Sequence, residues 1–259
     1  MPKREPHTTP APIRRSAAPL LADLVAVVTG ASSGIGRAIA VALAEHGAAV
    51  CVAGRNAARL GETVEQAQLH SRALPFQADL AVDEGVARLH QVLAQEFGAV
   101  DILVHSAGVI QHNLMSDARI EDLDEQYAAD IRAPYLLTKS LLPMLKASHG
   151  QVVFINSSLA VNAKRPEVGQ FAATQHAIKA IADSLREEVN REGIRVLSLY
   201  LGRTATPRQQ RLYEQEEKVY QPELLMQPED VAAMVISALT LPRTAEVTDI
   251  SMRPLLKSY

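Results

Sequence analysis

Short aliphatic runs alternate with stretches of helical spacing along most of this chain, and this alternation restricts its fold more than any other feature. The pattern predicts strands at 24–28, 49–53, 73–76, 101–104, 152–155, 195–199 and 246–250. It predicts helices at 35–46, 56–70, 82–97, 120–146, 168–192 and 228–241, with a long polar connection at 201–227. Strands separated by helices of this length form right-handed βαβ units. We therefore expect an α/β fold, a single doubly wound parallel sheet of Rossmann type with helices on both faces.

The length of the chain suits one such domain. It has 259 residues, and we assign 21–259 to a dinucleotide-binding domain. Residues 1–20 are rich in proline and show little apolar periodicity. Such composition predicts a disordered or surface-lying extension.

Composition and charge argue against several classes of protein. The net charge is −3 and the pI about 6.2, so no basic surface indicates nucleic acid. No apolar run is long enough to span a membrane, and no secretory signal begins the chain, so we expect a cytoplasmic protein. The only cysteine, Cys51, lies in an apolar run and should be buried and inert. No spacing of His, Cys, Asp and Glu indicates a metal site.

The most specific motif is the segment TGASSGIG at 29–36, which follows the first strand and opens the first helix. Glycines allow a tight turn and let the backbone approach a pyrophosphate, which a helix N-terminus attracts. A glycine triplet alone is weak evidence, but between a strand and a helix it is strong. We assign the phosphate site to Gly30, Ser32, Ser33, Gly34, Ile35 and Gly36.

This loop resembles the cofactor loop of the short-chain dehydrogenases/reductases, and the resemblance covers nearly all of 24–254. Asp79 and Leu80 match the adenine-contacting segment after the family's third strand. The segment HSAG at 105–108 lies where the family has Asn-Asn-Ala-Gly, and Thr206 matches a threonine beside the nicotinamide. The resemblance therefore implies cofactor contacts from Asp79, Leu80, Ser106, Ala107, Gly108 and Thr206.

The residue after the second strand distinguishes the two nicotinamide cofactors. An acid there accepts hydrogen bonds from a ribose 2′-hydroxyl, whereas an arginine pairs with a 2′-phosphate. The strand here ends Ala53-Gly54-Arg55, with no acid. Arg55 favours NADP(H) over NAD(H), although a merely solvated loop arginine is the alternative.

The resemblance also places the family's proton relay, and three of its four positions differ here. In the family a Ser holds the substrate oxygen, a Tyr moves the proton, a Lys lowers the pKa of that Tyr and binds the ribose, and an Asn completes a water-linked path. Ser158 matches the Ser, whereas Phe171, Gln175 and Asp130 stand at the Tyr, Lys and Asn positions. Phe has no hydroxyl and Gln no charge, although Gln175 can still bind a ribose. Ordinary carbonyl reduction should lose the roughly 10²–10⁴-fold that general acid–base catalysis contributes.

Ser158 and Asp130 are therefore the candidate catalytic residues. Burial raises the pKa of a carboxyl, so Asp130 could act as acid or base near neutrality. Its structural alternative is to accept a hydrogen bond from Gln175 or from the backbone. Three arginines in the polar connection, Arg203, Arg208 and Arg211, could recognise an acidic substrate. A solvated charged helix is the commoner explanation for such residues.

Three functions stay open. The first is an NADP(H)-binding protein that lacks the Tyr/Lys relay and performs non-standard chemistry on a small carbonyl-containing metabolite, whether or not the cofactor is turned over. The second is a non-catalytic subunit that supports an active relative. The third is a slow NADP(H)-dependent oxidoreductase that uses Ser158 and water. By resemblance, the helices 120–146 and 168–192 pack against a second subunit, which implies a homodimer, a homotetramer or a mixed oligomer.

Overall fold

The fold is a seven-stranded parallel sheet. The computed structural model describes residues 20–256, so the predicted extension at 1–20 lies, except for Leu20, outside the described residues. The strands are β1 (Val25–Thr29), β2 (Ala49–Gly54), β3 (Ala73–Gln77), β4 (Ile102–His105), β5 (Gln151–Ser157), β6 (Arg195–Leu201) and β7 (Asp249–Met252). All neighbours pair in parallel, in the order β3-β2-β1-β4-β5-β6-β7. The predicted parallel sheet is confirmed, and its order reverses between β1 and β4.

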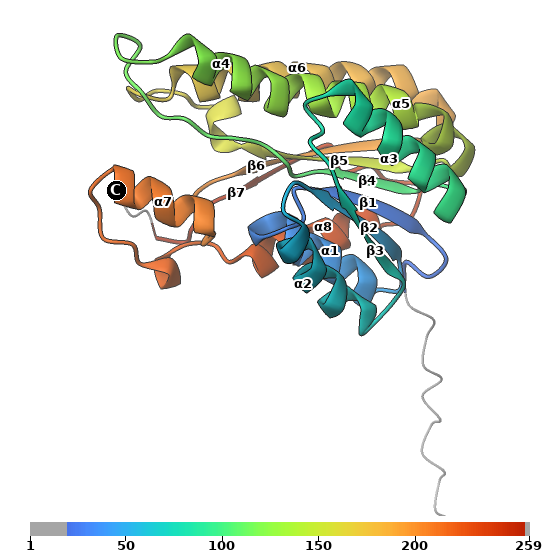
Figure 1. The fold of residues 1–259 in the computed structure, drawn as a ribbon. Helices are drawn as coiled ribbons and strands as arrows, with labels where there is room; N and C mark the ends of the chain where they lie inside the picture. Colours follow the sequence, from blue (N-terminus) through green and yellow to red (C-terminus); the bar gives the residue numbers. More distant parts are fainter. Residues whose placement is uncertain (1–19, 257–259) are drawn as a thin grey trace, which may run out of the picture.

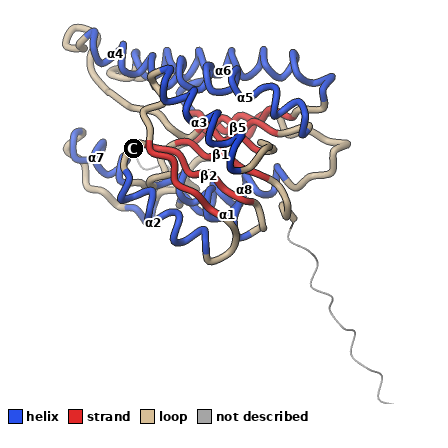
Figure 2. The backbone as a smooth tube through the Cα atoms, turned by 45° about the vertical axis from the view of Figure 1, so that its right-hand side comes forward, coloured by secondary structure: helices blue, strands red, loops and turns tan. Residues whose placement is uncertain are grey.

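Helices cover both faces of this sheet (Figures 1 and 2). On one face lie α1 (Gly34–Glu45), α2 (Ala57–Gln68) and α8 (Pro228–Leu239). On the other lie α3 (Asp83–Glu96), α4 (Ile120–Tyr127), α5 (Ala133–Ser148) and α6 (Gly169–Val189). The doubly wound architecture predicted from the alternation is therefore present.

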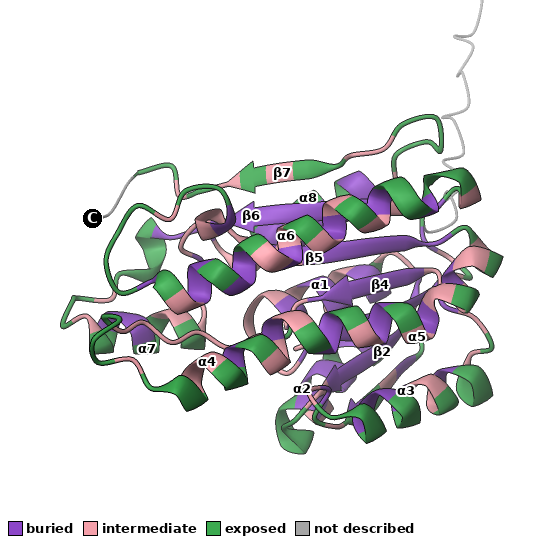
Figure 3. Ribbon diagram, turned by 90° about the horizontal axis from the view of Figure 1, so that it is seen from above, coloured by how far each residue is buried: buried purple, intermediate pink, exposed green. Residues whose placement is uncertain are grey.

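The side chains of β1 show how the sheet divides the core. Ala26 and Val28 point into a cluster beneath α1 and α8, whereas Val27 points into the cluster beneath α3, α5 and α6. Every residue of β1 is buried, as expected for a strand covered on both faces. Cys51 on β2 is also buried, so its expected burial is confirmed, and burial raises the pKa of its thiol to about 12, which disfavours the reactive thiolate. Only the edge strand β7 alternates between exposed and half-buried residues (Figure 3).

The helix predicted at 120–146 is interrupted. α4 ends at Tyr127, a π-helical turn occupies Ala128–Arg132, and α5 continues to Ser148. A π turn inserts one extra residue into the helical ladder and often marks a functional site. Apolar spacing alone does not reveal it, because the helical pattern continues on both sides of the turn.

The segment 201–227 is also more ordered than predicted. It contains α7 (Pro207–Gln215) and a 3₁₀ turn at Pro222–Leu224. Thr206 caps α7 by accepting a hydrogen bond from Gln209 N at 3.1 Å, and Pro207 occupies the first helical position. The last strand begins three residues later than predicted, at Asp249 instead of 246. No helix among residues 20–256 is long and apolar enough to cross a bilayer.

Candidate active site

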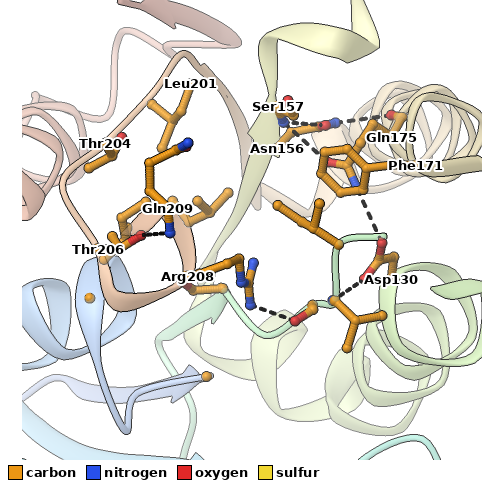
Figure 4. A pocket seen from close by; sticks show the side chains of 18 of the residues that line it. Asp130, Asn156, Ser157, Phe171, Gln175, Leu201, Thr204, Thr206, Arg208 and Gln209 are labelled. Carbon is orange, nitrogen blue, oxygen red and sulfur yellow. Dashed lines mark hydrogen bonds between the residues drawn. The ribbon is translucent and has the colours of Figure 1, made fainter. Parts of the chain in front are cut away.

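A cavity of about 370 Å³ opens at the carboxyl ends of the strands around the switch between β1 and β4. In this class of sheet the carboxyl ends at the switch point are where ligands bind. The loops after β1, β4, β5 and β6 all contribute to its lining, together with α6 and α7. Figure 4 shows Thr206, Arg208 and Gln209 on one side of the cavity and Asp130, Phe171 and Gln175 on the other. The cavity thus joins segments that are far apart in the sequence.

The glycine loop forms a tight cradle at one end of this cavity. Gly30 has a φ of +66°, and a Cβ added to it would lie 2.7 Å from the backbone nitrogen of Ala107. A Cβ at Gly36 would lie 2.5 Å from the carbonyl oxygen of Gly30. Only glycine allows the loop to approach the β4 loop and α1 this closely. The backbone is therefore shaped for a group that lies against it, as a pyrophosphate does.

The side chain of Thr29 fastens this cradle to the neighbouring loop. Its hydroxyl accepts hydrogen bonds from Ser106 N at 3.1 Å and Ala107 N at 3.2 Å, and it donates one to Val104 O at 3.3 Å. The β1 and β4 loops are therefore held together even though 75 residues separate Thr29 from Val104. The motif contains this threonine, but its role emerges only when β1 and β4 are neighbours.

Most of the predicted cofactor residues meet in the cavity. Its lining includes Gly30, Ser33, Gly34, Ile35, Gly36, Ser106, Ala107, Gly108, Gln175 and Thr206. Four predicted residues lie beyond it: Ser32, Arg55, Asp79 and Leu80. Arg55 is exposed at the end of β2, and Asp79 is exposed with its carboxylate accepting a hydrogen bond from Ala81 N at 2.9 Å. They flank the cradle on the β2–β3 side, where an adenosine end would extend out of the cavity.

Asp130 lies in the π turn, and its carboxylate is held by three donors. Oδ1 accepts a hydrogen bond from Val109 N at 2.8 Å. Oδ2 accepts one from the Thr174 hydroxyl at 3.0 Å and a long one from Gln175 Nε2 at 3.5 Å. The extra residue of the π turn therefore presents a carboxylate to α6 and to the β4 loop together. Both structural partners expected for Asp130, the backbone and Gln175, are present.

Burial dominates the pKa of Asp130. It raises the pKa from 3.8 to about 6, although the hydrogen bonds from Val109 and Thr174 act in the opposite direction. This carboxyl lines the cavity and changes charge near neutrality. It is a suitable group for proton transfer at physiological pH.

This pKa predicts how stability depends on pH. The folded protein keeps the Asp130 proton up to about pH 6, whereas the unfolded chain loses it near the ordinary value of 3.8. Unfolding therefore releases a proton between these two pH values. Raising the pH through this window lowers the free energy of unfolding by up to about 3 kcal/mol, because each unit of pKa difference corresponds to about 1.36 kcal/mol. In urea titrations across pH 4 to 7, Asp130→Asn should lack this decrease. An identical pH dependence in the two proteins would show that Asp130 titrates normally.

Gln175 is bonded within the protein at both ends of its amide. Its Oε1 accepts a hydrogen bond from Ser157 N at 3.1 Å, and its Nε2 donates to Asp130 and to the Thr174 hydroxyl, the latter at 3.3 Å. The side chain is buried, and so is the ring of Phe171 one turn earlier on α6. Both still line the cavity, so this wall offers an apolar ring and an uncharged amide.

The hydroxyls of Ser157 and Ser158 have different surroundings. Ser157 Oγ accepts a hydrogen bond from Leu159 N at 3.2 Å and caps the short 3₁₀ turn Ser158–Ala160. The Ser158 hydroxyl makes no hydrogen bond to another residue within 20–256, and Ser158 lines the cavity. Ser158 is therefore the serine whose hydroxyl can donate to a ligand, and its catalytic role stays a prediction.

Two histidines line the cavity as neutral groups. Burial lowers the pKa of His105 to about 3, and its ring stacks on Phe154 with centroids 4.8 Å apart. Burial and the neighbouring Arg165 lower the pKa of His112 to about 4. Among residues 20–256, no group of three His, Cys, Asp or Glu side chains is arranged to hold a metal ion.

Sequence reasoning missed three charged residues of the cavity. Arg59 comes from α2, Arg165 from the loop after β5 and Glu216 from the end of α7. None of the three belongs to a motif that marks it as a site residue. Their common location follows only from the packing of these elements against the sheet edge.

A doubly wound parallel sheet with a glycine cradle at its switch point is the Rossmann-type architecture, which is typical of dinucleotide-binding proteins. The chain belongs to the short-chain dehydrogenase family, whose family model matches residues 24–217. An uncharacterised oxidoreductase of Staphylococcus epidermidis is 33% identical over 233 residues, covering 90% of this chain and 97% of the relative. The fold of this chain and its membership of an oxidoreductase family are thereby established.

Solved structures of the same fold contain NADP or an analogue. An alcohol dehydrogenase from the archaeon Thermococcus sibiricus, complexed with 5-hydroxy-NADP, superposes with a TM-score of 0.82 at 26% identity, covering 91% of this chain and 98% of that one. A short chain dehydrogenase from Burkholderia cenocepacia in complex with NADP gives 0.79 at 28% identity, covering 90% and 97%.

Proposed function

We propose that this protein binds NADP(H) and performs non-standard chemistry on a small carbonyl compound without a tyrosine–lysine proton relay. One observation carries the proposal. The hydroxyl of Ser158, which has no hydrogen-bond partner among residues 20–256, lines the same cavity as the Asp130 carboxyl, whose pKa is raised to about 6.

The shape of the glycine cradle supports the cofactor assignment. The close approach of Gly30 to Ala107, and of Gly36 to Gly30, leaves backbone exposed to a pyrophosphate at the start of α1. Arg55 beside the cradle and Arg59 in the lining supply positive charge for a 2′-phosphate. When bound, NADPH supplies a hydride and its oxidised form accepts one. The NADP complexes of the relatives agree with this choice.

Each residue of the cavity then has a separate role toward a bound substrate. Ser158 donates a hydrogen bond to the carbonyl oxygen and orients it. Asp130 gives or takes a proton near neutrality, because its burial holds the pKa close to physiological pH. Phe171 forms an apolar wall that excludes water, and Gln175 holds the Asp130 carboxylate in place through its amide. This set of groups suits proton transfer next to a carbonyl, such as dehydration or isomerisation, as well as assisted hydride transfer.

A second candidate function is that of a non-catalytic subunit. The observation in its favour is that Asp130 and Gln175 are saturated by Val109, Ser157 and Thr174, as purely structural groups would be. In that case the protein would bind NADP(H) and support an active relative in a mixed oligomer. A related chain should then copurify with it.

Substitution of the two candidate residues separates these functions. With NADPH present, product formation from a panel of small ketones and hydroxyketones would be followed by NMR alongside NADPH oxidation. Asp130→Asn should lower turnover by about 10²-fold or more if the carboxyl transfers the proton. Ser158→Ala should lower it as well, whereas Asp124→Asn, an exposed acid on α4, should leave it unchanged.

The other outcomes point to other functions. Turnover that depends on Ser158 but not on Asp130, with NADPH consumed, would indicate the slow oxidoreductase that uses water. No turnover of any panel compound, together with unchanged NADPH binding in both variants, would favour the non-catalytic subunit.

A further inference from the structure

The cavity has an excess of positive charge. Its lining contains five arginines, Arg59, Arg165, Arg203, Arg208 and Arg211, but only two carboxylates, those of Asp130 and Glu216. Arg208 and Arg211 form no ion pair within residues 20–256. Arg208 instead donates to the Gly108 carbonyl at 2.5 Å, across the cavity (Figure 4). Even with Glu216 in place, the lining attracts anions.

Glu216, at the end of α7, occupies the centre of a cationic cluster. Its Oε2 is 2.8 Å from Arg203 Nη2 and 2.9 Å from Lys218 Nζ, and its Oε1 is 3.1 Å from Arg165 Nη2. Burial by itself would raise the pKa of Glu216, but the hydrogen bonds from Lys218, Arg203 and Arg165 lower it to about 2. The carboxylate is therefore ionised throughout the physiological range, and three cations share one negative charge.

This cluster reaches the Phe171 wall of the cavity through His112. Nδ1 of His112 is 3.3 Å from Arg165 Nη2, and the His112 ring is 6.2 Å from the ring of Phe171. The Nε2 atom of His112 is buried without a partner in the described chain. Because the pKa of His112 is lowered to about 4, its ring is neutral and adds a polar contact instead of a charge. The end of the cavity next to the proposed chemistry is thus lined by guanidinium groups.

Arg165 and Arg203 come from different loops and converge on a single carboxylate. Arg165 follows β5 and is 38% exposed at its side chain, whereas Arg203 follows β6 and is 21% exposed. The guanidinium of Arg203 lies over the Tyr213 ring, 4.6 Å from its centroid, in a cation–π contact. Two guanidinium groups held in this way form a receptor for a planar carboxylate.

We propose that this end of the cavity selects a small carboxylate-bearing substrate, whose carboxylate binds Arg165 and Arg203 in place of Glu216. This inference rests on the proposed function, because it names the substrate class of the same cavity. Exchange of an internal carboxylate for an external one keeps the two guanidinium groups paired. The displaced Glu216 can keep its ion pair with Lys218, the most exposed of its three cations. A neutral analogue has no charge with which to displace Glu216.

Two matched ligands test the proposal by calorimetry on the NADPH-loaded protein. Acetoacetate and its neutral methyl ester share the ketone and differ in the carboxylate. We expect the dissociation constant of acetoacetate to be at least about tenfold lower than that of the ester, because hydrogen bonds to a charged group are stronger than those to a neutral one. Arg165→Gln should weaken acetoacetate binding by about tenfold and leave ester binding unchanged.

Glu216→Gln distinguishes displacement from a structural role. If Glu216 competes with the substrate, its removal should tighten acetoacetate binding about tenfold, opposite to the effect of Arg165→Gln. If the cluster only fastens α7, both variants should weaken binding. Arg72→Gln is the matched control, because Arg72 pairs with Glu96 on the surface away from the cavity.

Three outcomes would overturn the proposal. The protein could bind acetoacetate and the ester with equal affinity, it could bind neither, or Glu216→Gln could weaken the binding of acetoacetate. Cofactor binding is read separately, from NADPH fluorescence. If the wild-type protein failed to bind NADPH, the proposed function would be wrong, while the acetoacetate and ester titrations of the cofactor-free protein would still decide whether the cluster receives a carboxylate.

Discussion

Phe171→Tyr combined with Gln175→Lys should raise NADPH-dependent reduction of small ketones by about 10²–10⁴-fold. Phe171 and Gln175 both line the cavity, four residues apart on α6, so the new side chains would face the same space. An ammonium group beside a phenol lowers the pKa of that phenol and favours proton transfer. The double variant would thus supply the relay that we propose this chain has lost.

Asp130 should limit the activity of this double variant. Gln175 Nε2 lies 3.5 Å from Asp130 Oδ2, so the introduced ammonium would form a buried ion pair with that carboxylate. Such a pair would hold the lysine away from the ribose and the phenol. Adding Asp130→Asn removes the competing charge, and we expect the triple variant to be more active than the double one.

The rate of NADPH oxidation with a panel of ketones would be measured for the wild-type protein, the double variant and the triple variant. NADPH fluorescence shows whether each of them binds the cofactor. Phe171→Tyr alone is the control, since a phenol without the neighbouring charge keeps a high pKa. If the triple variant bound NADPH but reduced no ketone, then residues 171 and 175 would not hold the relay positions.

Gly30→Ala should destabilise the fold by about 2–5 kcal/mol and weaken NADPH binding by about tenfold or more. The left-handed backbone at φ +66° is strained for any residue with a Cβ. The new methyl group would also lie 2.7 Å from the backbone of Ala107, so the cradle and the β4 loop would have to separate. Urea unfolding measures the free energy of unfolding, and fluorescence titration measures the affinity for NADPH.

Gly61→Ala is the matched control for this glycine. Gly61 lies inside α2, and a Cβ there would meet nothing within 4 Å. The variant should be stabilised by about 0.5–1 kcal/mol, with unchanged NADPH affinity. Unchanged NADPH binding in Gly30→Ala would instead show that the cradle does not hold the cofactor.

Local patterns in the sequence were enough to predict the sheet and its glycine loop. Each buried strand is a short aliphatic run, and the segment 29–36 carries its turn chemistry within eight consecutive residues. Because parallel strands separated by helices have few possible topologies, the position of the loop at the switch point followed as well. Thr206 before Pro207 is a local signal for the start of α7, but the many polar and charged residues around it favoured the prediction of a loop.

The sequence by itself therefore determined the fold, the family resemblance and the residue types at positions 130, 158, 171 and 175. Only the tertiary structure decided what these residues do to one another. The π turn that aims Asp130 at Gln175, the free hydroxyl of Ser158 and the meeting of Arg165 and Arg203 at Glu216 join residues from separate elements. The physical reason is that helix and strand periodicity depends on neighbours in sequence, whereas pKa values and ion pairs depend on distances across the fold.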